Sequence, residues 1–262
     1  MWEIDRVPPN AADWAFFLDV DGTLLEHAEH PHGVRVGAEH RHLLQGLQRA
    51  TSGAVALISG RSVADLDQLF APLDFAAAGQ HGIERRSIDG AVHRHTASLE
   101  HLGHAAAQIV QLTAAHAALV FENKGLTLAL HYRQAPELRE LVASEMQRIA
   151  VELGDEFELQ AGKFIYEIKP SGKDKGTAIA EFMQETPFAG RVPVFAGDDL
   201  TDEYGFAHVE ASGGHSIKVG PGETHARWRL AHDFAVRRWL AEYVGWSDMR
   251  QGAKSGGGDD QP

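Results

Sequence analysis

The sequence predicts an α/β fold: a doubly wound (Rossmann-like) parallel sheet core with an inserted α+β cap domain. Apolar runs alternate with helical patterns toward both ends of the chain, which is typical of a parallel sheet covered by helices on both faces. In the middle, the pattern changes to two helices and antiparallel strand pairs. We therefore expect a core from residues 1–97 and 171–252, a cap from residues 98–170 and a disordered, glycine-rich tail from residues 253–262.

The core elements follow from apolar runs and helical stripes. Five short apolar runs predict buried strands at 15–20, 54–58, 75–78, 192–196 and 216–219. Three leucines on one stripe predict a helix over about 37–50. Ser62, three residues before Asp65, predicts a capping box at the start of another helix. A last helix is expected over about 233–244, capped by Asp233 and docked through Trp239.

The cap elements are predicted from turn and helix signals. A helix is expected from Ser98 to about 117, and a strand pair over 118–133, with Gly125 near a turn or bulge. Pro136 should open a second helix that runs to about 153. Residues 157–170 are typical of a hairpin that turns near Ala161-Gly162.

Composition excludes several classes of function. The chain has no cysteine, which excludes disulfides and thiolate metal sites. A net charge of −13 argues against a broad basic face, so we expect no nucleic-acid partner. No apolar run approaches the roughly 18 residues that span a bilayer, and the N-terminal stretch lacks a signal-peptide pattern. We expect a cytoplasmic monomer with no membrane partner.

The run FFLDVDGTLL at residues 16–25 carries the strongest chemical signal. Asp19 and Asp21 follow a buried strand two positions apart, so both side chains lie on one face of its C-terminal end. Buried carboxylates are costly unless they are used, and ligands bind at the ends of central parallel strands. Gly22 allows a sharp turn there. A carboxylate nucleophile beside a second carboxylate fits covalent phosphoryl transfer with Mg²⁺.

Three further segments fall at the ends of predicted core elements. Ser59-Gly60-Arg61 follows the second strand and offers a hydroxyl and a glycine to a phosphate oxygen. Lys173–Gly176 enters a helix, where a lysine adds positive charge beside helix-terminal N–H groups. Gly197–Glu203 follows the strand at 192–196, and its three aspartates suit a hard cation.

In their order and spacing, these four segments resemble the haloacid dehalogenase superfamily of aspartyl phosphotransferases. The resemblance implies that Asp19 is the nucleophile, and that Asp21 protonates the leaving alkoxide and then deprotonates the attacking water. It also implies that Lys175 is the catalytic lysine. It also implies a phosphate-binding set and a set that holds Mg²⁺, with Asp202 steering Lys175. The phosphate-binding set is Thr23, Ser59, Gly60 and Lys175, and the Mg²⁺ set is Asp19, Asp21 (through its main-chain carbonyl), Asp198 and Asp199.

Three segments of the inserted region are distinctive: Glu122–Gly125, His131–Arg133 and Gly162–Pro170. They resemble the cap motifs of trehalose-6-phosphate phosphatases. Gly79–Gly82 and GDDLTDE in the core also fit that family, so the match runs from about residue 14 to 245. By this resemblance Glu122, Lys124, Lys163 and Glu167 contact sugar hydroxyls. Arg61, His81 and Arg133 complete the expected substrate-binding set. Strict alternation places Arg133 on the face opposite Glu122 unless Gly125 forms a bulge.

The resemblance implies a Mg²⁺-dependent hydrolysis of trehalose 6-phosphate to trehalose and phosphate through an aspartyl phosphate. Alternatives remain open: a phosphatase of sucrose phosphate or mannosylglycerate phosphate, a phosphomutase, or a non-catalytic regulatory subunit that binds a sugar phosphate. Each Lys/Glu pair of the cap alone would also fit a surface ion pair. His81 fits either a cleft position or a structural one. His27, His30 and His32 fit a solvated loop better than a metal site.

Overall fold

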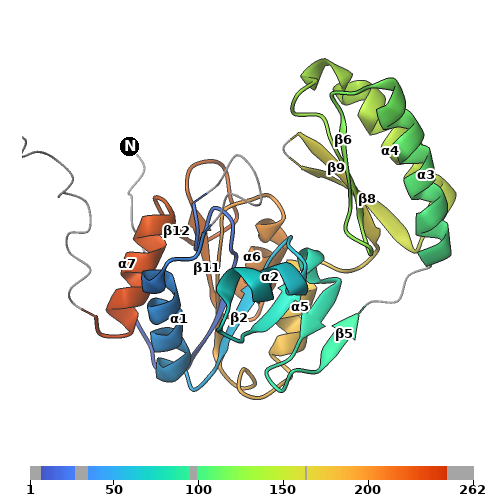
Figure 1. Ribbon diagram of the computed structural model, residues 1–262. Helices are drawn as coiled ribbons and strands as arrows, with labels where there is room; N and C mark the ends of the chain where they lie inside the picture. Colours follow the sequence, from blue (N-terminus) through green and yellow to red (C-terminus); the bar gives the residue numbers. More distant parts are fainter. Residues whose placement is uncertain (1–6, 27–34, 95–98, 163, 247–262) are drawn as a thin grey trace, which may run out of the picture.

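The computed structural model describes residues 7–26, 35–94, 99–162 and 164–246, and it contains two sheets (Figure 1). The larger sheet has eight strands in the order β12-β11-β10-β1-β2-β3-β4-β5. The strands from β12 to β3 pair in parallel, and β4 and β5 add an antiparallel edge. Their bounds are β1 Trp14–Leu18, β2 Val55–Ile58, β3 Ala76–Gly79, β4 Glu84–Arg86, β5 Val92–Arg94, β10 Val192–Gly197, β11 His215–Val219 and β12 Trp228–Leu230.

Helices cover both faces of this sheet because the side chains of a strand alternate. In β1, Trp14, Phe16 and Leu18 pack on one side in a cluster with residues of α1, α2 and α7. Ala15 and Phe17 pack on the other side with residues of α5 and α6. The helices are α1 Ala38–Ala50, α2 Val63–Phe70, α5 Lys175–Phe182, α6 Asp202–Ala211 and α7 Asp233–Tyr243. The predicted doubly wound architecture is confirmed.

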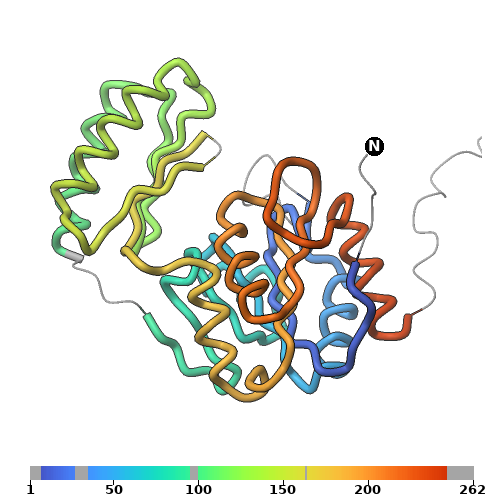
Figure 2. The backbone as a smooth tube through the Cα atoms, turned by 180° about the vertical axis from the view of Figure 1, so that it is seen from behind, coloured from blue at the N-terminus to red at the C-terminus, as the bar shows by residue number. Residues whose placement is uncertain are grey.

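The smaller sheet is antiparallel, in the order β6-β7-β9-β8. A separate apolar cluster joins one of its faces to the helices α3 and α4. Both helices lie on the side away from the larger sheet, so the opposite face of the small sheet is turned toward the core (Figures 1 and 2). The bounds are α3 Leu99–Ala115, β6 Val120–Asn123, β7 Leu128–His131, α4 Arg139–Leu153, β8 Phe157–Gly162 and β9 Ile165–Pro170.

Several local predictions are confirmed. Every predicted core strand is present, and Ser62 and Asp65 form the expected capping box at the start of α2. Pro136 opens a 3₁₀ turn, Pro136–Leu138, that leads into α4. Gly125 lies in the β6–β7 turn with φ +84°, and the four residue pairs of that ladder are consecutive, without a bulge.

Other local predictions were wrong or incomplete. The last hairpin turns after Gly162, because β8 continues to that residue and pairs it with Ile165. The N-cap residue of helix α7 is His232, whose imidazole accepts a hydrogen bond from the Ala235 N–H. Asp233, which was predicted to cap this helix, is already helical. The prediction missed β4, β5, β12 and α6. Ser98, His27, His30, His32 and the tail lie outside the described residues.

None of the described helices combines the length and the apolar character needed to cross a membrane.

Candidate active site

The predicted catalytic segments meet at the carboxyl ends of β1, β2 and β10, which are neighbours in the sheet. Asp19 follows β1, Ser59 follows β2 and Asp198 follows β10. Lys175 is the first residue of α5, whose N-terminus is fixed by a capping box between Asp174 and Thr177. Four segments that are far apart in the sequence therefore deliver their side chains to one edge of the sheet.

Lys175 joins two carboxylates at the centre of this edge. Its Nζ lies 2.7 Å from Oδ1 of Asp19 and 2.6 Å from Oδ1 of Asp202. All three residues are buried. The other oxygen of Asp202 accepts hydrogen bonds from the backbone N–H groups of Asp198 and Asp199, at 2.9 and 2.8 Å. Asp202 thus fixes both the lysine and the acidic loop.

Burial and neighbouring charges shift the pKa values of this cluster. Burial raises the pKa of Asp19 well above its ordinary value; Lys175 opposes this, while Asp202 and Asp198 add to it. Burial alone would lower the pKa of Lys175, but the two carboxylates raise it, so the side chain stays an ammonium ion. Asp19 and Asp202 thus share the Lys175 ammonium, with a carboxylate oxygen of Asp198 close by, and a further cation would favour the ionised form of Asp19.

The arrangement of oxygen atoms also suits a cation. One carboxylate oxygen each from Asp19, Asp198 and Asp202 lies within 4.8 Å of the others. Carboxylate oxygens are the ligands that Mg²⁺ prefers. Asp199, which was predicted to belong to this set, lies outside the cluster: it is exposed, and its carboxylate accepts a hydrogen bond from the Leu200 N–H at 2.6 Å.

The predicted phosphate-binding residues surround the same point. Thr23 is buried and donates from its hydroxyl to Oδ1 of Asp198 at 3.3 Å. The Ser59 hydroxyl is buried and accepts a hydrogen bond from the Arg61 N–H at 3.1 Å. At Gly60, a Cβ atom would come within 2.7 Å of the His81 ring, so only glycine allows this close approach. Arg61 binds both carboxylate oxygens of Asp21, each at 2.6 Å.

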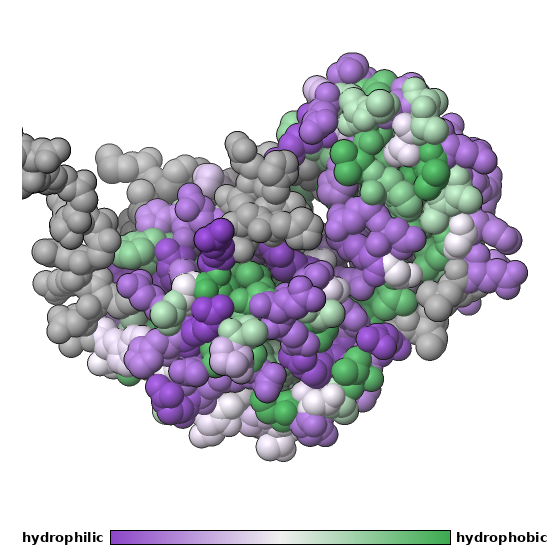
Figure 3. All heavy atoms as spheres, in the orientation of Figure 1, coloured by the Kyte–Doolittle hydropathy of each residue, from purple (hydrophilic) through white to green (hydrophobic). Residues whose placement is uncertain are grey.

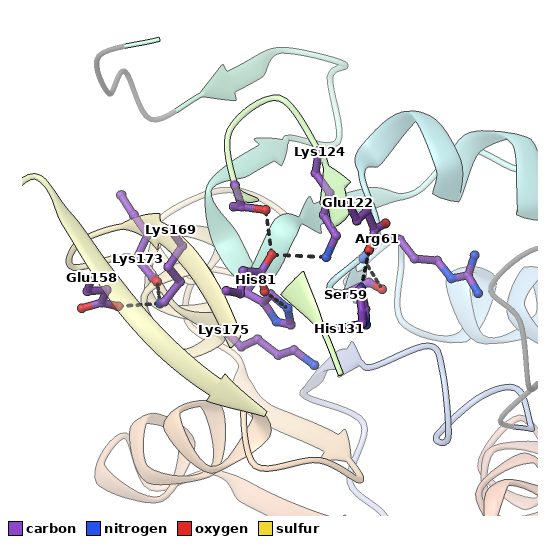
Figure 4. Close-up of polar contacts among 12 residues, drawn as sticks. Ser59, Arg61, His81, Glu122, Lys124, His131, Glu158, Lys169, Lys173 and Lys175 are labelled. Carbon is purple, nitrogen blue, oxygen red and sulfur yellow. Dashed lines mark hydrogen bonds and ion pairs between the residues drawn. The ribbon is translucent and has the colours of Figure 1, made fainter. Parts of the chain in front are cut away.

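Cap residues face this edge from the small sheet (Figure 4). Glu167 is buried; its Oε1 accepts from the Thr127 hydroxyl at 2.6 Å and from Lys124 Nζ at 3.2 Å. Its Oε2 lies 3.6 Å from Nε2 of His81. Burial would raise the pKa of Glu167, but Lys124 and the Thr127 hydrogen bond lower it overall. Gln80 connects the two parts of the chain by donating to the carbonyl of Lys124 at 3.1 Å.

His81 lies between the core and the cap. Burial lowers its pKa to about 3, and Lys175 and Lys124 contribute to this shift, so the ring is neutral near pH 7. Its Nδ1 is buried without a hydrogen-bond partner among the described residues. Both Gln80 and His81 have positive φ angles, 48° and 58°, an unusual backbone conformation that directs the two side chains toward the cap.

The structure places the other predicted substrate residues less centrally. Glu122 accepts a hydrogen bond from His131 at 3.1 Å, which lowers the Glu122 pKa. The prediction placed the odd-numbered residues of this region, and with them Arg133, on the face opposite Glu122. This was wrong, because the register pairs Glu122 with Ala129 and so places His131 on the same face as Glu122. Arg133 is exposed beyond the end of β7, with its guanidinium carbon 5.9 Å from the centre of the Phe164 ring. Lys163 lies outside the described residues.

The sequence interpretation missed several polar residues of this region. The Thr127 hydroxyl donates to Glu167, and the Gln80 side chain donates to the Lys124 carbonyl. Lys218 of β11 donates to the backbone carbonyl of Asp198. Lys218 carries a sequence signal, because a lysine within an apolar strand is costly to bury without a partner. On the face shown in Figure 3, the coloured atoms at the junction of core and cap are mostly hydrophilic.

Comparison with known proteins agrees with this geometry. The family model described as trehalose-phosphatase matches residues 17–237. The trehalose-6-phosphate phosphatase of Escherichia coli K12 is 47% identical over 90% of this chain and 89% of its own length.

Solved structures share the fold. The C-terminal domain of a Candida albicans trehalose-6-phosphate phosphatase superposes with a TM-score of 0.79 at 21% identity, over 89% of this chain and 93% of that one. A phosphatase of the haloalkanoate (HAD) superfamily from Bacteroides thetaiotaomicron gives a TM-score of 0.61 at 14% identity, over 92% and 98%. A family model that spans most of the sequence, together with 47% identity to a relative across nearly its whole length, makes this chain a member of the trehalose-phosphatase family.

Proposed function

We propose that this protein is a Mg²⁺-dependent phosphatase that hydrolyses trehalose 6-phosphate to trehalose and phosphate. One observation carries the proposal: the buried Lys175 bridges Asp19 and Asp202 beside Asp198, and the Lys124–Glu167 pair of the cap faces this group. The first group suits a phosphoryl centre, and the second suits a neutral sugar, whose hydroxyls bind charged partners strongly. The identity to the Escherichia coli enzyme supports the choice of substrate.

The proposed reaction has two displacements. A carboxylate oxygen of Asp19 attacks phosphorus, the bond from phosphorus to the sugar oxygen breaks, and Asp21 gives its proton to that oxygen. Water then attacks the aspartyl phosphate while Asp21 takes a proton from the water, which releases phosphate and regenerates Asp19. Lys175 and Ser59 are placed to bind the phosphoryl oxygens.

The acidic cluster fits the proposed metal ion. Asp19, the main-chain carbonyl of Asp21 and Asp198 would hold Mg²⁺, with Asp202 beside it, and the ion would supply positive charge that offsets the carboxylates and the phosphoryl group. The raised pKa of the buried Asp19 supports this assignment, because a cation in addition to Lys175 would favour its carboxylate form.

We further propose that residues 98–170 act as a cap that closes on the core residues 1–97 and 171–252, excluding bulk water while Glu122, Lys124, Lys163, Glu167 and Arg133 contact the sugar. The protein is proposed to act as a cytoplasmic monomer without nucleic-acid or membrane partners.

A phosphate-release screen with Mg²⁺ tests this function. The substrates are trehalose 6-phosphate, sucrose phosphate, mannosylglycerate phosphate and hexose phosphates. The highest kcat/KM is expected for trehalose 6-phosphate. A higher kcat/KM for another glycosyl phosphate would make that ester the substrate instead of trehalose 6-phosphate. A requirement for a bisphosphate activator would indicate a phosphomutase. Binding without phosphate release would indicate a regulatory subunit.

A further inference from the structure

Arg61 was predicted to bind substrate, but in the structure its guanidinium binds both oxygens of the Asp21 carboxylate. Nε of Arg61 lies 2.6 Å from Oδ2 of Asp21, and Nη2 lies 2.6 Å from Oδ1. Two parallel bonds of this kind fix the plane as well as the position of a carboxylate. The side chains are 15% and 31% exposed, so the pair lies partly shielded from water at the rim of the site.

The backbone holds Arg61 in place from both sides. Its N–H donates to the Ser59 hydroxyl at 3.1 Å, and its carbonyl accepts from the Gln80 N–H at 2.8 Å. The N–H of His81 in turn donates to the Ser59 carbonyl at 2.9 Å. The loop that carries Arg61 is therefore tied to the end of β3, and Arg61 lies beside Ser59 on it (Figure 4).

Among the described residues, Asp21 has no comparable support of its own. It lies on the turn after β1, where Gly22 has φ +89°, and its backbone pairs with Leu25 in an isolated bridge. Lys175 binds Asp19 and Asp202 but is not bonded to Asp21. Arg61 is thus the described residue that fixes both oxygens of the Asp21 carboxylate.

We propose that Arg61 is a positioning residue that acts through Asp21: it aligns this carboxyl group for proton transfer to and from the reacting oxygens. The inference rests on the proposed function. When the bond between phosphorus and the sugar oxygen breaks, the Asp21 proton moves to that oxygen, and the two N–H groups of Arg61 are placed to bind both oxygens of the resulting carboxylate. The same carboxylate then accepts a proton from the attacking water.

Three phosphate esters separate this role from direct substrate contact. Trehalose 6-phosphate and phenyl phosphate both have basic leaving oxygens that need a proton, whereas p-nitrophenyl phosphate releases a stable anion. Phenyl phosphate is also too small to reach the cap. The kcat/KM value reports the first displacement, in which the leaving group departs.

For Arg61→Met we expect kcat/KM to fall about 100-fold for trehalose 6-phosphate and for phenyl phosphate, the scale of a misplaced catalytic group. The fall should be far smaller for p-nitrophenyl phosphate. A loss confined to trehalose 6-phosphate would make Arg61 a sugar contact, and equal losses on all three esters would make it a phosphoryl contact. Either result overturns the proposal.

A double-mutant cycle on phenyl phosphate gives an independent test. If Arg61 acts through Asp21, then Asp21→Asn/Arg61→Met should be no slower than Asp21→Asn alone, and multiplied losses would refute the proposal. Arg148→Met, on the outer cap helix, controls for loss of an arginine. Circular dichroism verifies folding; if Arg61→Met does not fold, Arg61→Lys, which keeps the charge but not the two parallel bonds, replaces it. A wild-type protein that hydrolyses none of the esters would instead refute the proposed function.

Discussion

His81 should make the stability of the core depend on pH in a defined window. Its imidazole is 15% exposed, packs on Gly60 and lies 3.6 Å from Glu167. Burial lowers its pKa in the folded protein to about 3, from an ordinary value of 6.5. The neutral ring is therefore favoured in the folded state, while the unfolded chain protonates it near pH 6.5.

The sign follows from proton linkage. Between pH 6.5 and about 3 the unfolded state binds more protons at His81, so the free energy of unfolding falls as the pH decreases through this window. At pH 5 the unfolded imidazole lies 1.5 pH units below its ordinary pKa of 6.5, and each unit corresponds to 1.36 kcal/mol. His81 should therefore cost about 2 kcal/mol of stability at pH 5 relative to pH 7.

His81→Asn removes the titration and keeps the backbone, because asparagine tolerates the φ of 58° at this position. Urea unfolding at pH 7 and pH 5 can be followed by tryptophan fluorescence. All five tryptophans lie outside residues 98–170, so the signal reports the core. Between the two pH values, wild type should lose about 2 kcal/mol more than His81→Asn.

His225→Asn serves as the matched control for replacing an imidazole by an amide, because this side chain is 89% exposed in the folded protein. If His81→Asn loses as much stability as wild type between pH 7 and pH 5, His81 is not held neutral by burial, and the placement of its ring is wrong.

Three further outcomes are expected. Asp19→Asn should lower kcat at least about 10³-fold while circular dichroism remains unchanged, because an amide cannot attack phosphorus; substantial turnover by a folded variant would remove Asp19 from this role. EDTA should abolish activity and added Mg²⁺ restore it, because the clustered carboxylate oxygens are the ligands that Mg²⁺ prefers; full activity after exhaustive chelation would refute the metal assignment. Glu167→Ala or Lys163→Ala should lower kcat/KM for trehalose 6-phosphate about 10- to 100-fold, the value of a charged hydrogen bond, but change p-nitrophenyl phosphate hydrolysis far less. Equal losses on both substrates would indicate that these cap residues are structural or catalytic.

The sequence predicted most of the core because its strands have strong local signals. A parallel strand buried on both faces is an uninterrupted apolar run, and β1, β2 and β10 all have this form. The elements that were missed have weaker signals. The strands β4 and β5, the last two at one end of the sheet, have only three residues each, with the charged sequences ERR and VHR, and α6 follows directly on the acidic loop.

The chemistry of the site was also predictable in outline, because residue type and spacing are local properties. Asp19 and Asp21 are two residues apart, and each of the other motifs is contained in a few consecutive residues. Their meeting at one edge follows from the rule that ligands bind at the carboxyl ends of parallel strands.

The sequence by itself determined the fold class, the residue types available for chemistry and the edge of the sheet where they meet. Tertiary structure decided which of these residues bond to each other. Asp202, and not Asp199, completes the acidic cluster, because the start of α6 turns its carboxylate toward Lys175. Arg61 binds Asp21 across 40 positions of the chain, and Lys124 binds Glu167 across 43. Hydrogen bonds need distances near 3 Å and defined directions, and only the packed chain fixes these between residues so far apart in sequence.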